Sequence, residues 1–160
     1  APAQLASLLG TRQAISAEML SLGDKAWTAY CSSNPTKLEA IIQTDTSALP
    51  FLRNALLRHL EQFPALENGL SRTEQQILET VAAGISDPVA IFRADQNKEE
   101  SPFMGDTPFW HYIYNLCTGP DPLLECTNHT QFVLPHEHIT DKTFLDQRLV
   151  LTKPGREVLD

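Results

Sequence analysis

A capping box is the clearest local signal in the sequence, and it sets where one helix begins. In Leu70-Ser71-Arg72-Thr73-Glu74, the side chains of Ser71 and Glu74 can each accept a hydrogen bond from the other residue's free backbone N–H. A helix therefore starts at this point. Its apolar stripe is expected at Ile77, Leu78, Val81 and Ala82, and Gly84 is a natural left-handed stop.

Two further helices are predicted after this one. Asp87 before Pro88 marks the start of the first, and Asp106 is expected to be the N-cap of the second. The polar run 95–101 between them is expected to be exposed to solvent.

Short strands and a last helix follow. The strands are predicted at 123–126 and 132–134, which form a hairpin around Asn128, and at 148–151. The third strand runs directly into a terminal helix that Thr152 caps.

The first part of the chain reads as almost wholly helical. Ser16 is the expected N-cap of one helix, and Asn34 before Pro35 opens a second. A third is predicted over 47–63, with Arg53 and Arg58 left in solvent. The sequence therefore predicts a helical subdomain over residues 1–65 and a second domain over residues 70–160.

The order of elements in the second domain is typical of a winged helix-turn-helix domain: three helices, a hairpin, then a strand that leads into a terminal helix. The segment Leu151-Thr152-x-x-Gly155-Arg156-x-Val158-Leu159 resembles the exit from the wing in many bacterial regulators. The expected fold class is mainly α with a small β-hairpin or wing.

A wider resemblance rests on a combination of short segments: Leu49-Pro50-x-Leu52, Ala55-Leu56-x-Arg58-His59-Leu60, Gly69 to Glu74, Pro102-Phe103-x-Gly105-Asp106 and Phe109-Trp110. Together they resemble the C-terminal half of an uncharacterised bacterial family whose members carry a separate N-terminal domain of unknown function. The resemblance implies that a domain precedes this chain, and it implies no catalytic residues. The start at Ala1 also indicates a piece of a longer protein.

Charge counts against nucleic acid as a partner. The 160 residues carry 12 Lys and Arg against 20 Asp and Glu, a net charge of -8. Over 71–119 there are three basic and seven acidic residues, a net charge of −4, and the third helix has no Lys or Arg over 107–115. Proteins that bind duplex DNA neutralise several phosphates, so this chain alone is not expected to bind it.

Three features of the sequence bear on the cellular compartment of the protein. No run of about 18 apolar residues could span a membrane, and the first ten residues do not read as a signal peptide. The three cysteines, Cys31, Cys117 and Cys126, are widely spaced and odd in number, which argues against a disulfide framework. A cytoplasmic location is expected.

Aromatic residues in and before the third helix are the predicted interaction site. Phe109 and Ile113 should face the core, which leaves other rings at least partly exposed, as protein interfaces favour. The alternative is that these rings pack against the preceding helical subdomain of the same chain. The predicted contact residues are Phe103, Trp110, Tyr112 and Tyr114.

Metal and catalytic signals are weak. His136 and His138 would point to the same side of an extended segment, but no further ligands stand at a standard spacing, and a polar loop is the simpler interpretation. No phosphate-binding loop, nucleophile elbow or cysteine–histidine motif is present, so no cofactor is expected.

The sequence therefore predicts a non-catalytic regulatory or protein-interaction module. Its partner would be another protein, a preceding domain or a second copy of the chain, and not a membrane. The main alternative is a DNA-binding transcription regulator whose basic surface lies outside this chain or arises by dimerisation. A metal-dependent enzyme centred on His136 and His138 is the third.

Overall fold

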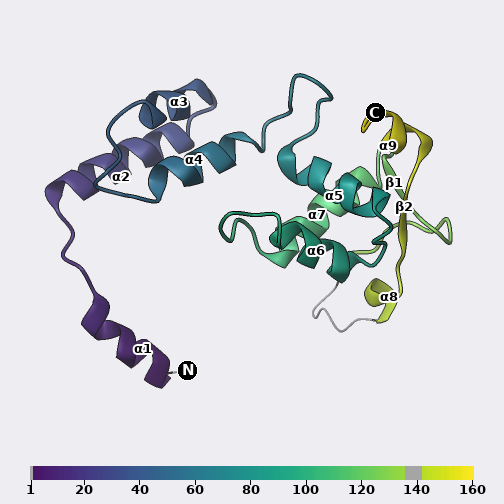
Figure 1. The fold of residues 1–160 in the computed structure, drawn as a ribbon, viewed down its shortest axis with the longest axis horizontal. Helices are drawn as coiled ribbons and strands as arrows, with labels where there is room; N and C mark the ends of the chain where they lie inside the picture. The colour runs from purple at the N-terminus through teal and green to yellow at the C-terminus, as the bar shows by residue number, and fades with distance from the viewer. Residues whose placement is uncertain (1, 136–141) are drawn as a thin grey trace. The chain divides into compact units, whose positions relative to one another are not determined.

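The computed structural model describes residues 2–135 and 142–160, and it divides the chain into two units, Ala1–Leu60 and Glu61–Asp160 (Figure 1). This division lies before the boundary predicted at 65–70, because residues 61–69 form hydrogen bonds with the residues that follow them in the second unit. The N–H of Arg72 donates to the Glu61 carbonyl at 2.8 Å, and the N–H of Ala65 donates to the Leu70 carbonyl at 2.9 Å.

The first unit is helical. Its elements are α1 (Pro2–Leu8), the 3-10 turn η1 (Leu9–Thr11), α2 (Ala17–Tyr30), α3 (Thr36–Ile42) and α4 (Leu52–Leu60). Ser16 caps α2 as predicted, because its hydroxyl accepts from the N–H of Met19 at 3.1 Å. The core lies among α2, α3 and α4, and its buried residues are Leu22, Ala26, Ala29, Leu38, Ile42 and Leu56.

Two predictions for this unit are wrong. The helix expected over 47–63 is shorter, since turns occupy the residues before α4 and the helix ends at Leu60. Arg58, expected in solvent, is only 8% exposed. Arg58 lies on α4, which packs on α3. More of the surface of α4 is therefore covered than its stripe of leucines alone indicates.

The second unit opens with three helices, α5 (Arg72–Ala82), α6 (Pro88–Gln96) and α7 (Asp106–Leu116). The capping box at Ser71 is confirmed, with both reciprocal bonds present. Asp87 is confirmed as the cap of α6, since its carboxylate accepts from the N–H of Ala90 at 2.8 Å. The N-cap of α7 is Gly105 and not Asp106, which lies inside the first turn and accepts from the N–H of Thr107 at 2.7 Å.

A two-stranded sheet follows the helices. Strand β1 (Leu124–Cys126) pairs antiparallel with β2 (Leu149–Leu151), and Leu124 lies opposite Leu151. The predicted strand at 132–134 does not form, so the hairpin around Asn128 is wrong. The Gln147 side chain takes the place of a neighbouring strand there: its oxygen accepts from the N–H of Val133 at 2.6 Å and its amide donates to the Val133 carbonyl at 2.9 Å.

The core of the second unit lies between the three helices, the sheet and the short helix α8 (Lys142–Leu145) (Figure 1). Its largest fully buried side chains are Trp110, Phe109, Phe144, Ile77, Leu78 and Ile91. Among the residues described, no helix has the length and apolar character that crossing a bilayer requires.

The end of β2 is fixed by a close contact with the chain before β1. Thr152 caps α9 (Lys153–Glu157) as predicted, since its hydroxyl accepts from the N–H of Gly155 at 3.1 Å, and it also donates to the Pro122 carbonyl at 2.6 Å. A Cβ at Gly155 would overlap the carbonyl of Leu123. Glycine is therefore required at this position for steric reasons.

We expect Gly155→Ala to destabilise the second unit by about 2 kcal/mol or more, because backbone atoms must move to admit the methyl group. Gly105→Ala is the matched control. Gly105 has an ordinary φ of -78° and nothing near its missing Cβ, so its loss should cost below about 1 kcal/mol, from the poorer N-cap. Urea unfolding followed by circular dichroism measures both; equal effects would show that the Leu123 contact is unimportant.

Candidate functional site

Trp110, the central residue of the predicted contact site, lies inside the second unit. It is 1% exposed, and its ring centroid lies 5.0 Å from that of Phe144 and 5.4 Å from that of Phe92. Trp110 is therefore not one of the rings of this site that stay partly exposed. Helix α8 supplies Phe144 from a distant part of the sequence, and this ring covers the side of α7 that the local pattern left open.

The other three predicted contact residues, Phe103, Tyr112 and Tyr114, are half-buried. The Tyr112 hydroxyl accepts a hydrogen bond from the Gln62 amide at 2.9 Å, and both tyrosine rings pack against the core of the second unit. Most of each tyrosine therefore serves the fold of this unit, and a role of their exposed edges in contacts with another molecule stays a prediction.

The exposed side of α7 is polar but uncharged. It consists of Thr107, Pro108, His111 and Asn115. His111 bonds through Nδ1 to the Thr107 carbonyl at 2.9 Å, so one of its two ring nitrogens is already used within the helix. This surface offers hydrogen-bonding groups and includes no Lys or Arg.

The histidines do not form a metal site in the part of the chain that the structure describes. His136 and His138 lie outside the described residues. His129 adopts a left-handed conformation with φ 56° and stands 3.5 Å from the Glu125 carboxylate, with its side chain 80% exposed. Within residues 2–135 and 142–160, no three His, Cys, Asp or Glu side chains are grouped to hold a metal ion.

Arg72 is the centre of a charged network that the sequence analysis missed. Its guanidinium donates to the Glu61 carboxylate at 2.8 Å and to the Glu100 carboxylate at 3.0 Å, and it lies 3.8 Å from Glu99. Partial burial disfavours the charged guanidinium, but the bonds to Glu61 and Glu100 outweigh that effect and raise the pKa of Arg72. The network joins the first turn of α5 to the segment after α6.

Gln76 extends this network into the interior. With its amide oriented to suit its neighbours, it accepts from Nε of Arg72 at 3.0 Å and donates to Asp95 at 2.9 Å. Asp95 is 1% exposed, so the expectation that the run 95–101 is exposed is wrong at this residue. The spacing of Arg72 and Gln76, one helical turn apart, could be read from the sequence and predicts that their side chains are neighbours. Their acidic partners come from another segment, which local spacing does not identify.

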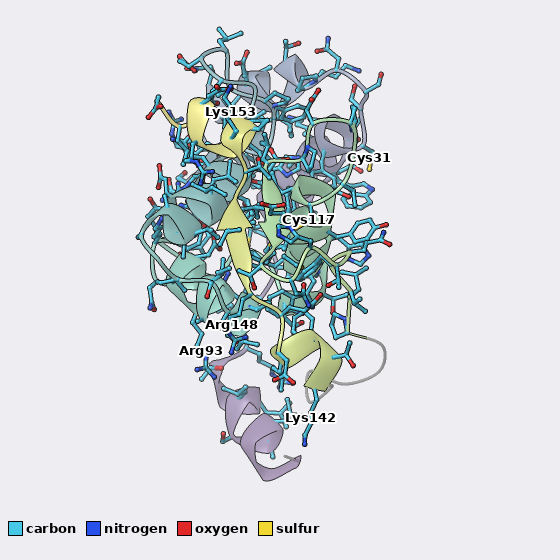
Figure 2. All side chains as sticks on the ribbon, turned by 90° about the vertical axis from the view of Figure 1, so that its right-hand side faces the viewer. Cys31, Arg93, Cys117, Lys142, Arg148 and Lys153 are labelled. Carbon is cyan, nitrogen blue, oxygen red and sulfur yellow. The ribbon has the colours of Figure 1, made fainter. Side chains whose placement is uncertain are left out.

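The three cysteines are free thiols that differ in their exposure. Cys31 is exposed, whereas Cys117 is half-buried and Cys126 is buried; Figure 2 labels Cys31 and Cys117. Burial raises the pKa of Cys117 to about 12, and the Cys126 thiol adds to this rise. Burial also raises the pKa of Cys126, with a contribution from the Glu125 carboxylate. Neither is an activated nucleophile.

Exposed apolar side chains are concentrated in the first unit. Twelve large hydrophobic residues are exposed among those described, and nine of them belong to this unit. The nine are Leu5, Leu8, Leu9, Ile15, Leu20, Trp27, Tyr30, Phe51 and Leu57. Sequence reasoning placed the interaction surface on α7, but the large apolar side chains that reach solvent lie mostly elsewhere.

Helix α2 has apolar residues on two opposite sides. Leu22, Ala26 and Ala29 face the core, while Leu20 and Trp27 are 63% and 65% exposed. Tyr30 continues this second side, since its ring stacks on Trp27 with centroids 5.7 Å apart and meets His59 at 4.9 Å. We call Leu20, Trp27 and Tyr30 the outer face of α2. A surface helix normally presents polar residues opposite its buried stripe, so this face is the candidate functional site.

No family model, curated protein or solved structure matches the chain.

The environments of the three cysteines predict that one thiol reacts much faster than the other two. At pH 8, Cys117 should be ionised to only about one part in ten thousand, and thiol reagents attack through the thiolate. Cys31 should therefore react quickly with a disulfide reagent in the folded protein, and Cys117 and Cys126 should react only after denaturation. Stopped-flow measurement of released thiol checks this, with Cys31→Ser as the control that removes the fast phase. A fast phase that persists in Cys31→Ser would contradict the assignment.

Proposed function

We propose that this chain is a regulatory or protein-interaction module whose contact surface lies in the first unit. The proposal rests mainly on the outer face of α2, where Leu20 and Trp27 are each more than 60% exposed. Exposed aromatic and aliphatic side chains grouped on one helix are typical of protein interfaces, where the residues that contribute most to binding are enriched in Trp and Tyr. Single exposed apolar side chains are common on protein surfaces, whereas a contiguous exposed patch marks an interaction site.

The proposal includes a winged helix-turn-helix-like fold for the second unit. Three helices followed by β1 and β2, with α9 after them, support it. The N–H of Leu149 also donates to the Ser86 carbonyl at 2.9 Å, which brings the segment between α5 and α6 beside β2. The described residues between β1 and β2, 127–135 and 142–148, would then belong to an enlarged wing.

The charge of the second unit favours protein over DNA as the partner. Residues 61–160 carry seven Lys and Arg against sixteen Asp and Glu, a net charge of −9. The exposed side of α7, which would read base edges in such a fold, contributes no cation. A polyanionic duplex would be repelled.

Several basic side chains of this unit also form ion pairs with carboxylates. Lys98 lies 3.2 Å from Glu79, and Lys153 lies 3.4 Å from Glu157. Arg148 lies 3.4 Å from Asp87. Figure 2 shows Lys153 at one end of the unit, Lys142 at the other, and Arg93 and Arg148 between them. This distribution supports a mixed surface rather than a continuous track for phosphates.

Site-specific photo-crosslinking in intact cells tests the proposal. A diazirine amino acid at position 27 should give one discrete adduct with a separate protein chain, and the yield should fall when Leu20→Ser removes its neighbour on the outer face. The same amino acid at position 111, on the exposed side of α7, is expected to give no nucleic-acid adduct. Position 157, an exposed site on α9, is the background control.

Two results would overturn the proposal. One is a nucleic-acid adduct from position 111, as the DNA-binding alternative requires. The other is an adduct from position 27 that joins it only to other residues of the same chain, because the outer face would then serve the fold of the protein and not a partner.

A further inference from the structure

The segment before α2 carries a second set of exposed apolar side chains. Leu5, Leu8 and Leu9, in α1 and η1, are 70%, 58% and 63% exposed. Spacings of three and four residues place them on one side of a helix. We call residues 2–11, from α1 to η1, the arm. The sequence holds no charged residue from Ala1 to Thr11, so solvation of the arm depends on neutral polar groups alone.

The arm and the outer face of α2 have matching character. The outer face is a line of apolar side chains, since Leu20 and Trp27 are seven residues apart and nearly eclipsed along the helix. Asp24, also exposed, lies between them, while Arg12 follows the arm directly. A basic group at the end of an apolar segment thus complements an acidic group within an apolar face.

Both surfaces are exposed among the described residues of the first unit. Residues 12–16 have no regular structure and connect the arm to α2, and Ile15 within them is 68% exposed. Exchange of such an arm between two copies covers an apolar helix and an apolar face at once. Short connections of this kind permit the exchange of identical elements between protomers at low cost.

We infer that the partner of the outer face is a second copy of this chain, which seats its arm on α2 while receiving the arm of the first copy in return. This inference rests on the proposed function and specifies its partner. The arm, Ile15 and the outer face together expose seven large apolar side chains. Their burial removes roughly 700 Å² per copy, close to the approximately 800 Å² per partner of a standard stable interface.

The first measurement is the mass of the chain in solution by sedimentation, from about 1 to about 100 µM, because a reversible dimer depends on concentration. The wild-type chain should pass from one copy to two over this range. An arm variant, Leu5→Ser/Leu8→Ser/Leu9→Ser, and a face variant, Leu20→Ser/Trp27→Ser, should each weaken dimerisation at least about tenfold. All five side chains are exposed in the single chain, so circular dichroism should show both variants folded.

Phe51→Ser is the matched control. Phe51 belongs to the same unit and is 85% exposed, but it lies outside the arm and the outer face, so its replacement should leave the dimer unchanged.

Mixing the two variants distinguishes arm exchange from any other dimer. The face variant keeps an intact arm, and the arm variant keeps an intact outer face. In a dimer of one copy of each, the intact arm can therefore seat on the intact outer face, which restores one of the two arm–face contacts. The mixture should therefore give a mixed dimer at concentrations where each variant alone stays a single chain. A symmetric contact that does not involve arm exchange would not be restored in this way.

The inference is overturned if the wild-type chain remains a single copy up to about 100 µM, or if the mixture shows no mixed dimer at that concentration. A different protein attached at position 27 in the crosslinking experiment would leave the proposed function standing while this inference falls. An adduct within one chain would remove both.

Discussion

The packing of Trp110 holds the second unit together. Its ring contacts Phe92 from α6 and Phe144 from α8, and it meets the neighbouring Phe109 edge to face at 5.7 Å. Aromatic pairs of this kind contribute about 0.5–1.5 kcal/mol each beyond the area they bury. Because this side chain joins α6 and α7 to α8, the position of α8 depends on it.

This constraint also determines which surfaces are available for contacts. The interior takes up Phe109, Trp110 and Ile113, so α7 offers solvent a narrow polar side and the edges of its tyrosines. The dense aromatic content of this helix serves the core of the unit. The outer face of α2 differs, because Trp27 and Tyr30 stack on each other and remain in solvent.

The parts of the fold that the sequence predicted correctly are those governed by neighbours in the chain. Ser16, Ser71, Asp87 and Thr152 cap the helices that their spacing indicated, since each bond joins residues three apart. The hairpin around Asn128 was wrong because the partner of Val133 is a glutamine side chain fourteen residues away. No local pattern distinguishes that partner from a strand.

The candidate site was predicted less well, for a related reason. Aromatic density pointed to α7, but whether a ring is buried depends on what reaches it from elsewhere, and Phe144 does so for Trp110. The signal for α2 was present in the sequence: Leu20 and Trp27 lie on the side opposite Leu22 and Ala26.

Quenching of tryptophan fluorescence by acrylamide tests most directly the claim that α7 faces inward and α2 outward. The Trp27→Phe variant leaves Trp110 as the sole emitter, and its emission should be blue-shifted and resistant to the quencher in the folded state. The wild-type protein, measured as a dilute single chain, should contain an additional, readily quenched component from Trp27. If Trp110 in the folded variant were quenched as readily as in denaturant, the assignment of α7 to the core would be contradicted. If the wild-type protein showed no additional quenched component, the exposure of Trp27 on α2 would be contradicted.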